Sequence, residues 1–495
     1  MTERRAAAVA AADQTDSDYL RELGVEPRLR RALGFFTGSL FAIAFQGPTT
    51  GALLVTGATL ALGGPAFIWA IPLIYVFQLL VAFLWAELSS HYPLTGGIYQ
   101  WARQLGGDFV GWTTGLFYLV GIVLVMPAVG TVMNVVLSGL FTSLKVTTAS
   151  EVIIAIITTL VAALLIATSV RVVALINSIG VVLEIVVLVG AAIGLLLHTH
   201  QSISVLGNTG GTAATHSYLY PFMIVIALVV TQLVGFETAG AFAEETTQAR
   251  IKPSQAIIAG LTGTAILIFL FDLALLLAIP GVKPAMSNPE LIPSVLTAAL
   301  GSTFEKLFLV GALISVASTA IATLATIART IYGMARNNQL PGSGFLTRLS
   351  PKTDEPFGSV IIAALLSMIP LIFIKRVEVI VASITAMIVV PYVIVIAALI
   401  YRRLHGWPAT PARFSLKAFG LPLSIISLAW TVFVIIDAAW PRPSTNPHLG
   451  PFPVIEEIAA GTLIVAVLWW VLVLRKSTGN HPALSPPATA AAGRP

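Results

Sequence analysis

A series of apolar stretches, each long enough to cross a lipid bilayer as a helix, runs along nearly the whole chain; such a crossing takes about 20 residues. Only 10% of the 495 residues are charged, against about 25% in a soluble globular protein. So few charges cannot cover a chain of this size with a water-soluble surface. We therefore predict an all-α integral membrane protein with about twelve transmembrane helices. The predicted spans are 33–60, 66–90, 109–141, 150–168, 174–198, 219–244, 255–280, 304–337, 357–374, 378–401, 418–439 and 453–474.

The two ends of the chain differ from this apolar body. Residues 1–32 mix acidic residues with arginines and lack the apolar core of a signal peptide, so we expect a mobile cytosolic N-terminal arm. Residues 475–495 are low in complexity, which predicts a disordered cytosolic tail. With an even number of crossings, all but six of the 27 lysines and arginines fall on one side. The positive-inside rule then places both termini on the cytoplasmic side of a cell membrane.

Two of the predicted spans contain residues that interrupt helices. The first carries Gln-Gly-Pro-Thr-Thr-Gly at 46–51, and the sixth carries Gly235 and Gly240 around Glu237. Proline removes a backbone donor and glycine tolerates non-helical dihedrals. A membrane accepts such breaks only where they are buried in protein or line a cavity, and matching breaks in two halves indicate the binding site of a secondary transporter. Because these spans are five apart, we predict a 5+5 inverted repeat.

The predicted domains follow from this repeat. The transporter core covers 33–401, with its two inverted halves at about 33–198 and 219–401. Two additional transmembrane helices occupy 402–474. Glycine and proline are also common in transmembrane helices for reasons of packing. The prediction of a repeat therefore rests mainly on the separation of five spans between the two interrupted helices.

Three segments contain closely spaced glycine, proline, aromatic and charged residues. They are AELSSHYPLTGGIYQWARQLGG at 86–107, GFETAGAFAEETTQARIKPSQAI at 235–257 and ARTIYGMARNNQLP at 328–341. In this order they resemble motifs of the amino acid–polyamine–organocation (APC) superfamily of permeases, and the first is most similar to the amino acid/choline transporter branch. The resemblance implies the fold of the bacterial sodium-coupled leucine transporters. It also implies a substrate site between broken helices 1 and 6, closed by helices 3 and 8.

The resemblance further implies which residues bind the substrate. Many relatives carry Gly-Ser-Gly-Ile-Phe at the break of helix 1, where this chain has Thr-Thr-Gly-Ala-Leu at 49–53. The threonine hydroxyls can donate to a carboxylate beside the exposed N–H groups of the half-helix. The residues leave open whether an α-amino acid, a γ-amino acid, a polyamine or choline binds. The predicted substrate-binding residues are Gln46, Gly47, Thr49, Thr50, Gly51, Val234, Gly235 and Phe236.

Carboxylates inside a membrane are costly and indicate function. Glu184 lies in the fifth span, where several proton-coupled relatives carry a lysine in place of the sodium ion of sodium-coupled members. It can carry a proton, since burial favours the neutral form, help hold Na⁺ with hydroxyls of the eighth span, or serve packing alone. Glu237 is expected to couple substrate binding to gating or to cap unwound N–H groups, and we interpret Asp272 and Asp437 as vestibule or structural residues. The predicted coupling residues are Glu184, Glu237, Ser315, Ser318 and Thr319.

Charged residues also stand at the predicted cytoplasmic ends of several spans. The resemblance implies that they form an inner gate of ion pairs, although charges at helix ends are ordinary in membrane proteins. The predicted gate residues are Glu87, Glu244, Glu245, Arg250, Arg329 and Arg336.

Several function classes are disfavoured by what the sequence lacks. It has no cysteine, no phosphate-binding G-x-x-x-x-G-K-[ST] loop and no H-E-x-x-H motif, so we predict no enzyme activity, no cofactor, no metal site and no nucleic-acid partner. We expect a permease that moves an amino acid or related amine by alternating access, in symport or exchange with H⁺ or, in its place, Na⁺. The alternatives are a permease-fold nutrient sensor without net transport, and a choline or polyamine transporter.

Overall fold

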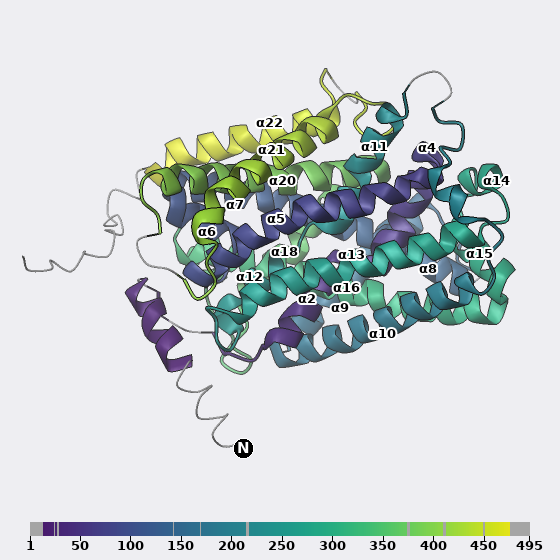
Figure 1. Ribbon diagram of the computed structural model, residues 1–495. Helices are drawn as coiled ribbons and strands as arrows, with labels where there is room; N and C mark the ends of the chain where they lie inside the picture. Colours follow the sequence, from purple (N-terminus) through teal and green to yellow (C-terminus); the bar gives the residue numbers. More distant parts are fainter. Residues whose placement is uncertain are drawn as a thin grey trace, which may run out of the picture.

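The structure, a computed structural model, is an elongated bundle of helices that run roughly along one axis (Figure 1). It describes residues 13–23, 25–26, 29–141, 143–168, 170–213, 217–373, 377–408, 412–448 and 451–475. Within these residues, 11 helices are long and apolar enough to cross a membrane. They are Phe35–Gly63, Pro65–His91, Asp108–Leu140, Thr148–Ile166, Arg171–Leu196, Leu219–Ala241, Lys252–Ala278, Ser302–Arg336, Glu378–Leu404, Lys417–Ala439 and Val454–Leu474. The predicted all-helical membrane protein is thereby confirmed.

Most of these spans are divided into shorter elements. In chain order the α-helices are α2 (Phe35–Gln46), α3 (Pro48–Gly51), α4 (Gly57–Gly63), α5 (Ala70–His91), α6 (Ile98–Gly106), α7 (Asp108–Val123), α8 (Val125–Leu140), α9 (Thr148–Ile166), α10 (Val170–Leu196), α11 (Leu219–Val229), α12 (Thr238–Ala241), α13 (Lys252–Ala278), α14 (Val282–Met286), α15 (Leu291–Leu300), α16 (Ser302–Arg336), α17 (Ser343–Leu346), α18 (Phe357–Met368), α19 (Pro370–Phe373), α20 (Val377–Leu404), α21 (Gly420–Ala439) and α22 (Val454–Trp469).

One predicted span, 357–374, is not a single long helix. It forms α18 and α19 instead, because the Pro370 ring and its missing N–H interrupt the hydrogen-bond ladder. The chain nevertheless passes along the bundle here. Glu355 pairs with Arg329 at one end, whereas Glu378 lines a vestibule at the other.

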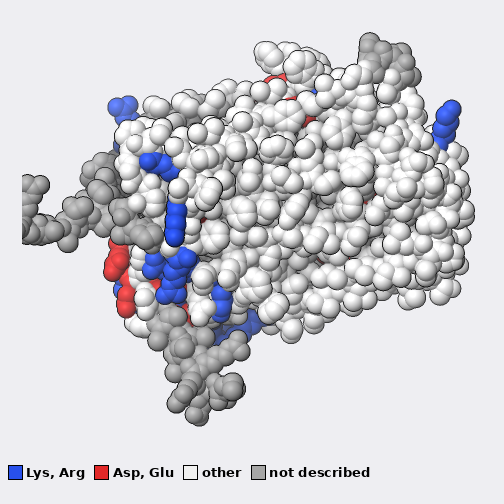
Figure 2. Space-filling model, in the orientation of Figure 1, with Lys and Arg blue, Asp and Glu red and all other residues white. Residues whose placement is uncertain are grey.

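Lysines and arginines gather at one end of the bundle, on the left in Figure 2. We call this end, which includes the ion pairs of Arg329 and Arg336, the charged end. The described part of the N-terminal arm packs there: residues 13–22 are helical, and Leu20 is fully buried. The predicted mobile arm is therefore held by contacts over these residues, while the predicted disordered tail from 476 onward lies outside the described part of the chain.

The two C-terminal helices lie along one side of the bundle, at the top of Figure 1. α21 packs against α20 and α5, and α22 packs against α7. The Trp112 indole N–H on α7 donates to the Ala466 carbonyl on α22 at 2.9 Å. The assignment of these two helices as additions to a core, and the division of that core into inverted repeats, stay predictions.

Candidate functional site

The first span is broken at Gly47. This residue adopts φ 55° and ψ 69° and ends α2, and Pro48 then begins α3, where a missing N–H does no harm. A Cβ atom added to Gly47 would lie 2.5 Å from the Thr319 hydroxyl oxygen, so a side chain does not fit here. The break therefore follows from the local residues and from the close approach of α16.

The sixth span is broken beside the first. α11 ends in a 3₁₀ turn over Val230–Leu233, and residues 234–237 are not helical before α12 begins. Gly235 adopts φ 93°, and a Cβ atom on it would overlap the Phe45 ring of α2. The two breaks are thus in direct contact.

A pocket lies at these two breaks. It is lined by Phe45, Gln46, Thr50, Gly51, Leu54, Val55, Val125, Ala128, Val129, Thr231, Gln232, Val234, Thr319, Ile384 and Ile388. Of the predicted substrate-binding residues, Gln46, Thr50, Gly51 and Val234 line it. The others, Gly47, Thr49, Gly235 and Phe236, shape the breaks without lining the pocket.

The pocket combines neutral polar groups with an aliphatic wall. None of its described lining residues is acidic or basic. The side-chain oxygens of Gln46 and Gln232 are buried and have no hydrogen-bond partner in the described structure. Gln232 was not among the predicted substrate-binding residues. No sequence pattern marked the aliphatic residues of α8 and α20 as part of the pocket, because apolar residues that line a pocket cannot be told from those that face lipid.

The Glu184 carboxylate reaches the break of the first span from α10. Its Oε1 atom accepts a hydrogen bond from the Thr49 backbone N–H at 2.7 Å, and the side chain is fully buried. The hydroxyls of Thr49 and Ser315 lie close to the carboxylate without reaching hydrogen-bond geometry. Glu184 thus holds one of the N–H groups that the break exposes.

Hydroxyls of α16 complete this cluster. The Thr319 and Thr50 hydroxyls are 3.2 Å apart, and the Ser318 hydroxyl donates to the Asn177 side-chain oxygen on α10 at 3.1 Å. The structure therefore brings Glu184 and Thr319 together at the break of the first span, with Ser315 beside the carboxylate and Ser318 at the adjacent α10–α16 contact.

Glu237 lies apart from this cluster. Its carboxylate accepts hydrogen bonds from the Tyr118 hydroxyl at 2.9 Å and from the Tyr392 hydroxyl. In this structure it does not bind the unwound N–H groups of the first span, which was one of the roles expected for it. The two tyrosines come from α7 and α20, and no local pattern in the sequence connected them to Glu237.

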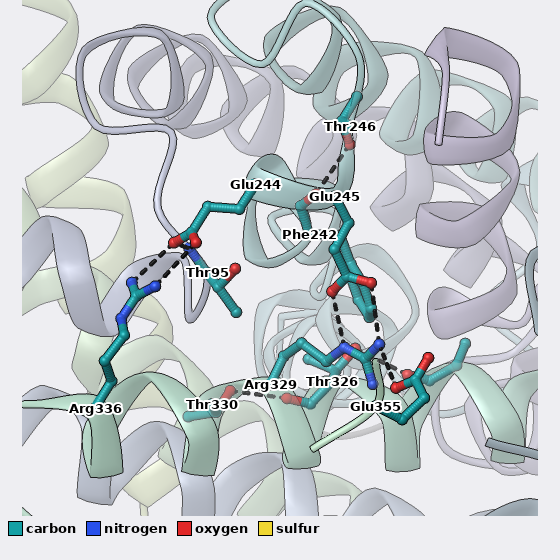
Figure 3. Close-up of polar contacts among 11 residues, drawn as sticks. Thr95, Phe242, Glu244, Glu245, Thr246, Thr326, Arg329, Thr330, Arg336 and Glu355 are labelled. Carbon is teal, nitrogen blue, oxygen red and sulfur yellow. Dashed lines mark hydrogen bonds and ion pairs between the residues drawn. The ribbon is translucent and has the colours of Figure 1, made fainter. Parts of the chain in front are cut away.

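Two sets of ion pairs, one fully and one partly buried, lie at the charged end, and Figure 3 shows both. Arg336 binds Glu244 through two hydrogen bonds of 2.9 and 2.8 Å. Arg329 binds Glu245 through two hydrogen bonds of 3.0 Å and also pairs with Glu355 at 2.7 Å. We call these five residues the ion-pair gate. They join the segment after α12 to α16 and to the loop before α18.

Glu355 is the member of the gate that sequence reasoning missed. It lies in a loop with no recognised motif, and only the fold brings it to Arg329. Burial raises the pKa of Glu355 to about 7, although the neighbouring Arg329 guanidinium acts in the opposite direction. The gate therefore contains a group that can change charge near neutral pH.

The other two predicted gate residues lie elsewhere at the charged end. Glu87 pairs with Arg403 of α20 and accepts a hydrogen bond from the Leu416 N–H at 2.9 Å. The Arg250 guanidinium lies 4.0 Å from the centre of the Tyr19 ring in the N-terminal arm. The predicted single network is thus divided, and Arg250 serves the docking of the arm.

A vestibule opens at the end of the bundle opposite the gate. It is lined by Leu53, Leu54, Gly57, Ala58, Ala61, Thr131, Val132, Val135, Met286, Ser287, Asn288, Pro289 and Glu378. Leu54 lines both the vestibule and the pocket. The pocket and the vestibule thus adjoin at Leu54, whereas the ion-pair gate lies at the charged end.

Comparison with known proteins gives the family to which this chain belongs. A match to the family described as amino acid permease spans residues 33–470. The chain belongs to this family. The resemblance seen in the sequence is confirmed, and the permease is a transporter rather than an enzyme, with an amino acid or amine as its substrate.

Individual relatives are distant. The permease is 24% identical over 487 residues to an uncharacterized amino-acid permease of Schizosaccharomyces pombe, covering 93% of this chain and 89% of that protein. It is 24% identical over 317 residues to the low-affinity putrescine importer PlaP of Escherichia coli, covering 61% and 67%. It is also 34% identical over 109 residues to the amino-acid permease BAT1 homolog of Oryza sativa subsp. japonica, which is 21% of each chain.

Proposed function

We propose that the permease transports a zwitterionic amino acid with an aliphatic side chain across the cell membrane by alternating access, in symport or exchange with H⁺. Both termini then lie in the cytoplasm, on the side of the ion-pair gate. The observation that carries the proposal is the isolated Glu184 carboxylate at the break of the first span. The pocket beside it supports alternating access, because it adjoins the vestibule at Leu54 toward one end of the bundle and the ion-pair gate lies toward the other.

Glu184 has the surroundings of a proton carrier. It accepts one N–H hydrogen bond, and no lysine or arginine of the described chain forms an ion pair with it. A charged carboxylate with so few partners is costly in the membrane interior. The neutral form is favoured while the cluster is closed, and movement of the first span or entry of water would release the proton. Binding in one state and release in another is what proton coupling requires.

The chemistry of the pocket favours an amino acid over a diamine. The ammonium group of an amino acid can donate to the free oxygens of Gln46 and Gln232, while its carboxylate can accept from Thr50 and exposed N–H groups. The similar importer PlaP is named for putrescine, but a diamine has two cationic ends and the lining provides no carboxylate. Phe45 is the one aromatic residue among the described lining, fewer than an aromatic cage for choline would contain.

Transport by reconstituted permease tests this proposal. Uptake of labelled alanine, valine, leucine, γ-aminobutyrate, putrescine and choline into proteoliposomes would be compared with and without a pH gradient, at equal Na⁺ on both sides. We expect uptake of an aliphatic amino acid that follows the pH gradient. The Glu184→Gln variant should lose gradient-driven uptake but keep substrate exchange, whereas Glu290→Gln, at an exposed position, should behave as the parent protein.

Three outcomes would contradict parts of the proposal. Uptake that needs Na⁺ and ignores the pH gradient would exclude proton coupling. Uptake of putrescine or choline alone would overturn the substrate. Ligand binding without uptake under any gradient would favour a permease-fold sensor.

A further inference from the structure

A second buried carboxylate touches the first span nearer the vestibule. Asp272 lies on α13 and is fully buried. Its Oδ1 atom accepts a hydrogen bond from the Thr56 hydroxyl at 3.0 Å, and its Oδ2 atom has no hydrogen-bond partner among the described residues. Sequence reasoning assigned Asp272 to a vestibule or to a structural role, and the mechanism proposed above does not use it.

No charge compensates Asp272 in the described structure. Three elements that pack against α13 carry titratable groups. These groups are Tyr75, Glu87 and His91 on α5, Arg171 and Glu184 on α10, and Glu305 and Lys306 on α16, whose Phe308 ring stacks on Phe271. The ends of α13 itself bear Lys252 and, through a hydrogen bond to the Ala278 carbonyl, His200. None of these groups forms an ion pair with Asp272 in the described structure. An isolated carboxylate with one hydroxyl donor, buried in a membrane protein, is far more costly charged than neutral.

The partner of Asp272 belongs to an unusual part of the first span. Residues Ala52–Thr56 form a π-helical turn between α3 and α4. Such turns are rare and are frequently found at functional sites; a second one lies at Trp470–Leu474, away from the pocket. Thr56 ends this turn, and Thr49 stands at the other end of the same half-helix. The half-helix from Pro48 to Gly63 is therefore held by Glu184 at one end and by Asp272 farther along.

We infer that Asp272 is a second proton-binding site of the permease, which binds H⁺ when the half-helix Pro48–Gly63 is in the position seen here and releases it when that half-helix moves. The inference rests on the proposed transport function for its role in the cycle. The reaction is a simple protonation, in which a carboxylate takes up H⁺ to form the neutral acid. The Thr56 hydroxyl positions the acid through its hydrogen bond.

The vestibule lies on the other face of the same turn. Leu53, Gly57 and Ala58 line the vestibule, while Thr56 faces Asp272. We expect a displacement of this turn away from α13 to open Asp272 to vestibule water. Protonation of Asp272 would then depend on pH at the vestibule side, whereas Glu184 lies deeper, beside the pocket.

The absence of cysteine from the chain allows a direct test. Ala58→Cys places a single thiol on the half-helix where it lines the vestibule. Its rate of labelling by a membrane-impermeant thiol reagent would be measured against pH in the parent background and with Asp272→Asn. Because the thiolate fraction of the introduced cysteine changes with pH in both proteins, the ratio of the two rates isolates the contribution of Asp272. This measurement needs neither substrate nor transport.

We expect the ratio to change with pH, and net uptake by Asp272→Asn to respond less steeply to pH than uptake by the parent protein. Thr56→Val removes the hydrogen-bond donor to the charged form of Asp272. The midpoint of the pH dependence of labelling should therefore move to a more alkaline pH by about one unit. If Asp272→Asn does not fold, Thr56→Val carries the test.

Two results separate this inference from the proposed function. A labelling ratio that is the same at every pH would show that Asp272 binds no proton in the working range, whatever the transport assay gives. Where Asp272→Asn does not fold, the same conclusion follows if Thr56→Val leaves the pH dependence of labelling unchanged. A ratio that changes with pH in a protein that shows no uptake would support the site while refuting the proposed transport function.

Discussion

The ion-pair gate gives the sharpest prediction, because one cation holds two buried carboxylates. We consider Arg329→Gln, which keeps much of the side-chain length but removes the charge. Arg329, Glu245 and Glu355 are all 2–3% exposed. The substitution leaves two carboxylates buried together without a counter-charge, in an arrangement that we expect only while the charged end is closed.

The magnitude follows from the burial of these groups. Breaking a buried ion pair by removing one partner costs about 3–5 kcal/mol. Glu355 can take up a proton, since its pKa is about 7, so we take the lower limit, about 3 kcal/mol. At about 1.4 kcal/mol for each factor of ten, the equilibrium should shift toward the open charged end by about 100-fold.

A cysteine reporter can measure this shift. Thr326 lies on α16 between the pocket residue Thr319 and Arg329, and it is fully buried. Labelling of Thr326→Cys by an impermeant thiol reagent, applied to the charged end in oriented vesicles, should be slow in the parent protein and about 100-fold faster with Arg329→Gln. Arg103→Gln is the control, because the Arg103–Asp108 pair is partly exposed and such pairs contribute little.

The double variant with Glu245→Gln provides a further check. Removing one carboxylate together with Arg329 leaves a single acid that can be neutral, so slow labelling should largely return. The reasoning is refuted if Arg329→Gln labels at the rate of the Arg103→Gln control, or if the double variant labels as fast as the single one.

Three further predictions concern the gate, the breaks and the pocket. Burial raises the pKa of Glu355 to about 7, so protonation of Glu355 stabilises the closed charged end at acid pH, and this contribution is lost as pH rises through about 7. Labelling of Thr326→Cys should therefore become faster as pH rises, relative to labelling in the Glu355→Gln background, which should lack this dependence. Gly235→Ala should lower stability by about 1–3 kcal/mol in thermal unfolding, because the new methyl group overlaps Phe45, whereas Gly344→Ala, with open space around it, should be neutral. Gln232→Glu adds a carboxylate to the pocket and should raise the competition by putrescine relative to valine in a binding assay.

The long helices and the two breaks follow from local sequence, and both were predicted. Residues 46–51 carry their own signal, since proline and glycine interrupt a helix whatever surrounds them. Pro370 carried the same kind of signal, yet the stretch 357–374 was predicted as one span because its apolar run is continuous. The structure shows that the proline divides it into α18 and α19.

The candidate site was predicted only in part. The residues of the two breaks were identified, and four of them line the pocket. The partners that determine their chemistry were not: Tyr118 and Tyr392 bind Glu237, and Thr56 binds Asp272. Each of these contacts joins residues far apart in the chain, so no local spacing connects them.

The amino-acid sequence alone determines that this chain enters a membrane, and nearly where each helix lies, because a bilayer admits only long apolar segments that satisfy their own backbone hydrogen bonds. It also determines where those helices break. Tertiary structure decides which charges meet. Arg329 pairs with Glu355 as well as with Glu245, and Glu87 pairs with Arg403 rather than with a residue of the ion-pair gate. The physical reason is that such pairs depend on the rotation and register of packed helices, and these are set by contacts between side chains across the whole bundle.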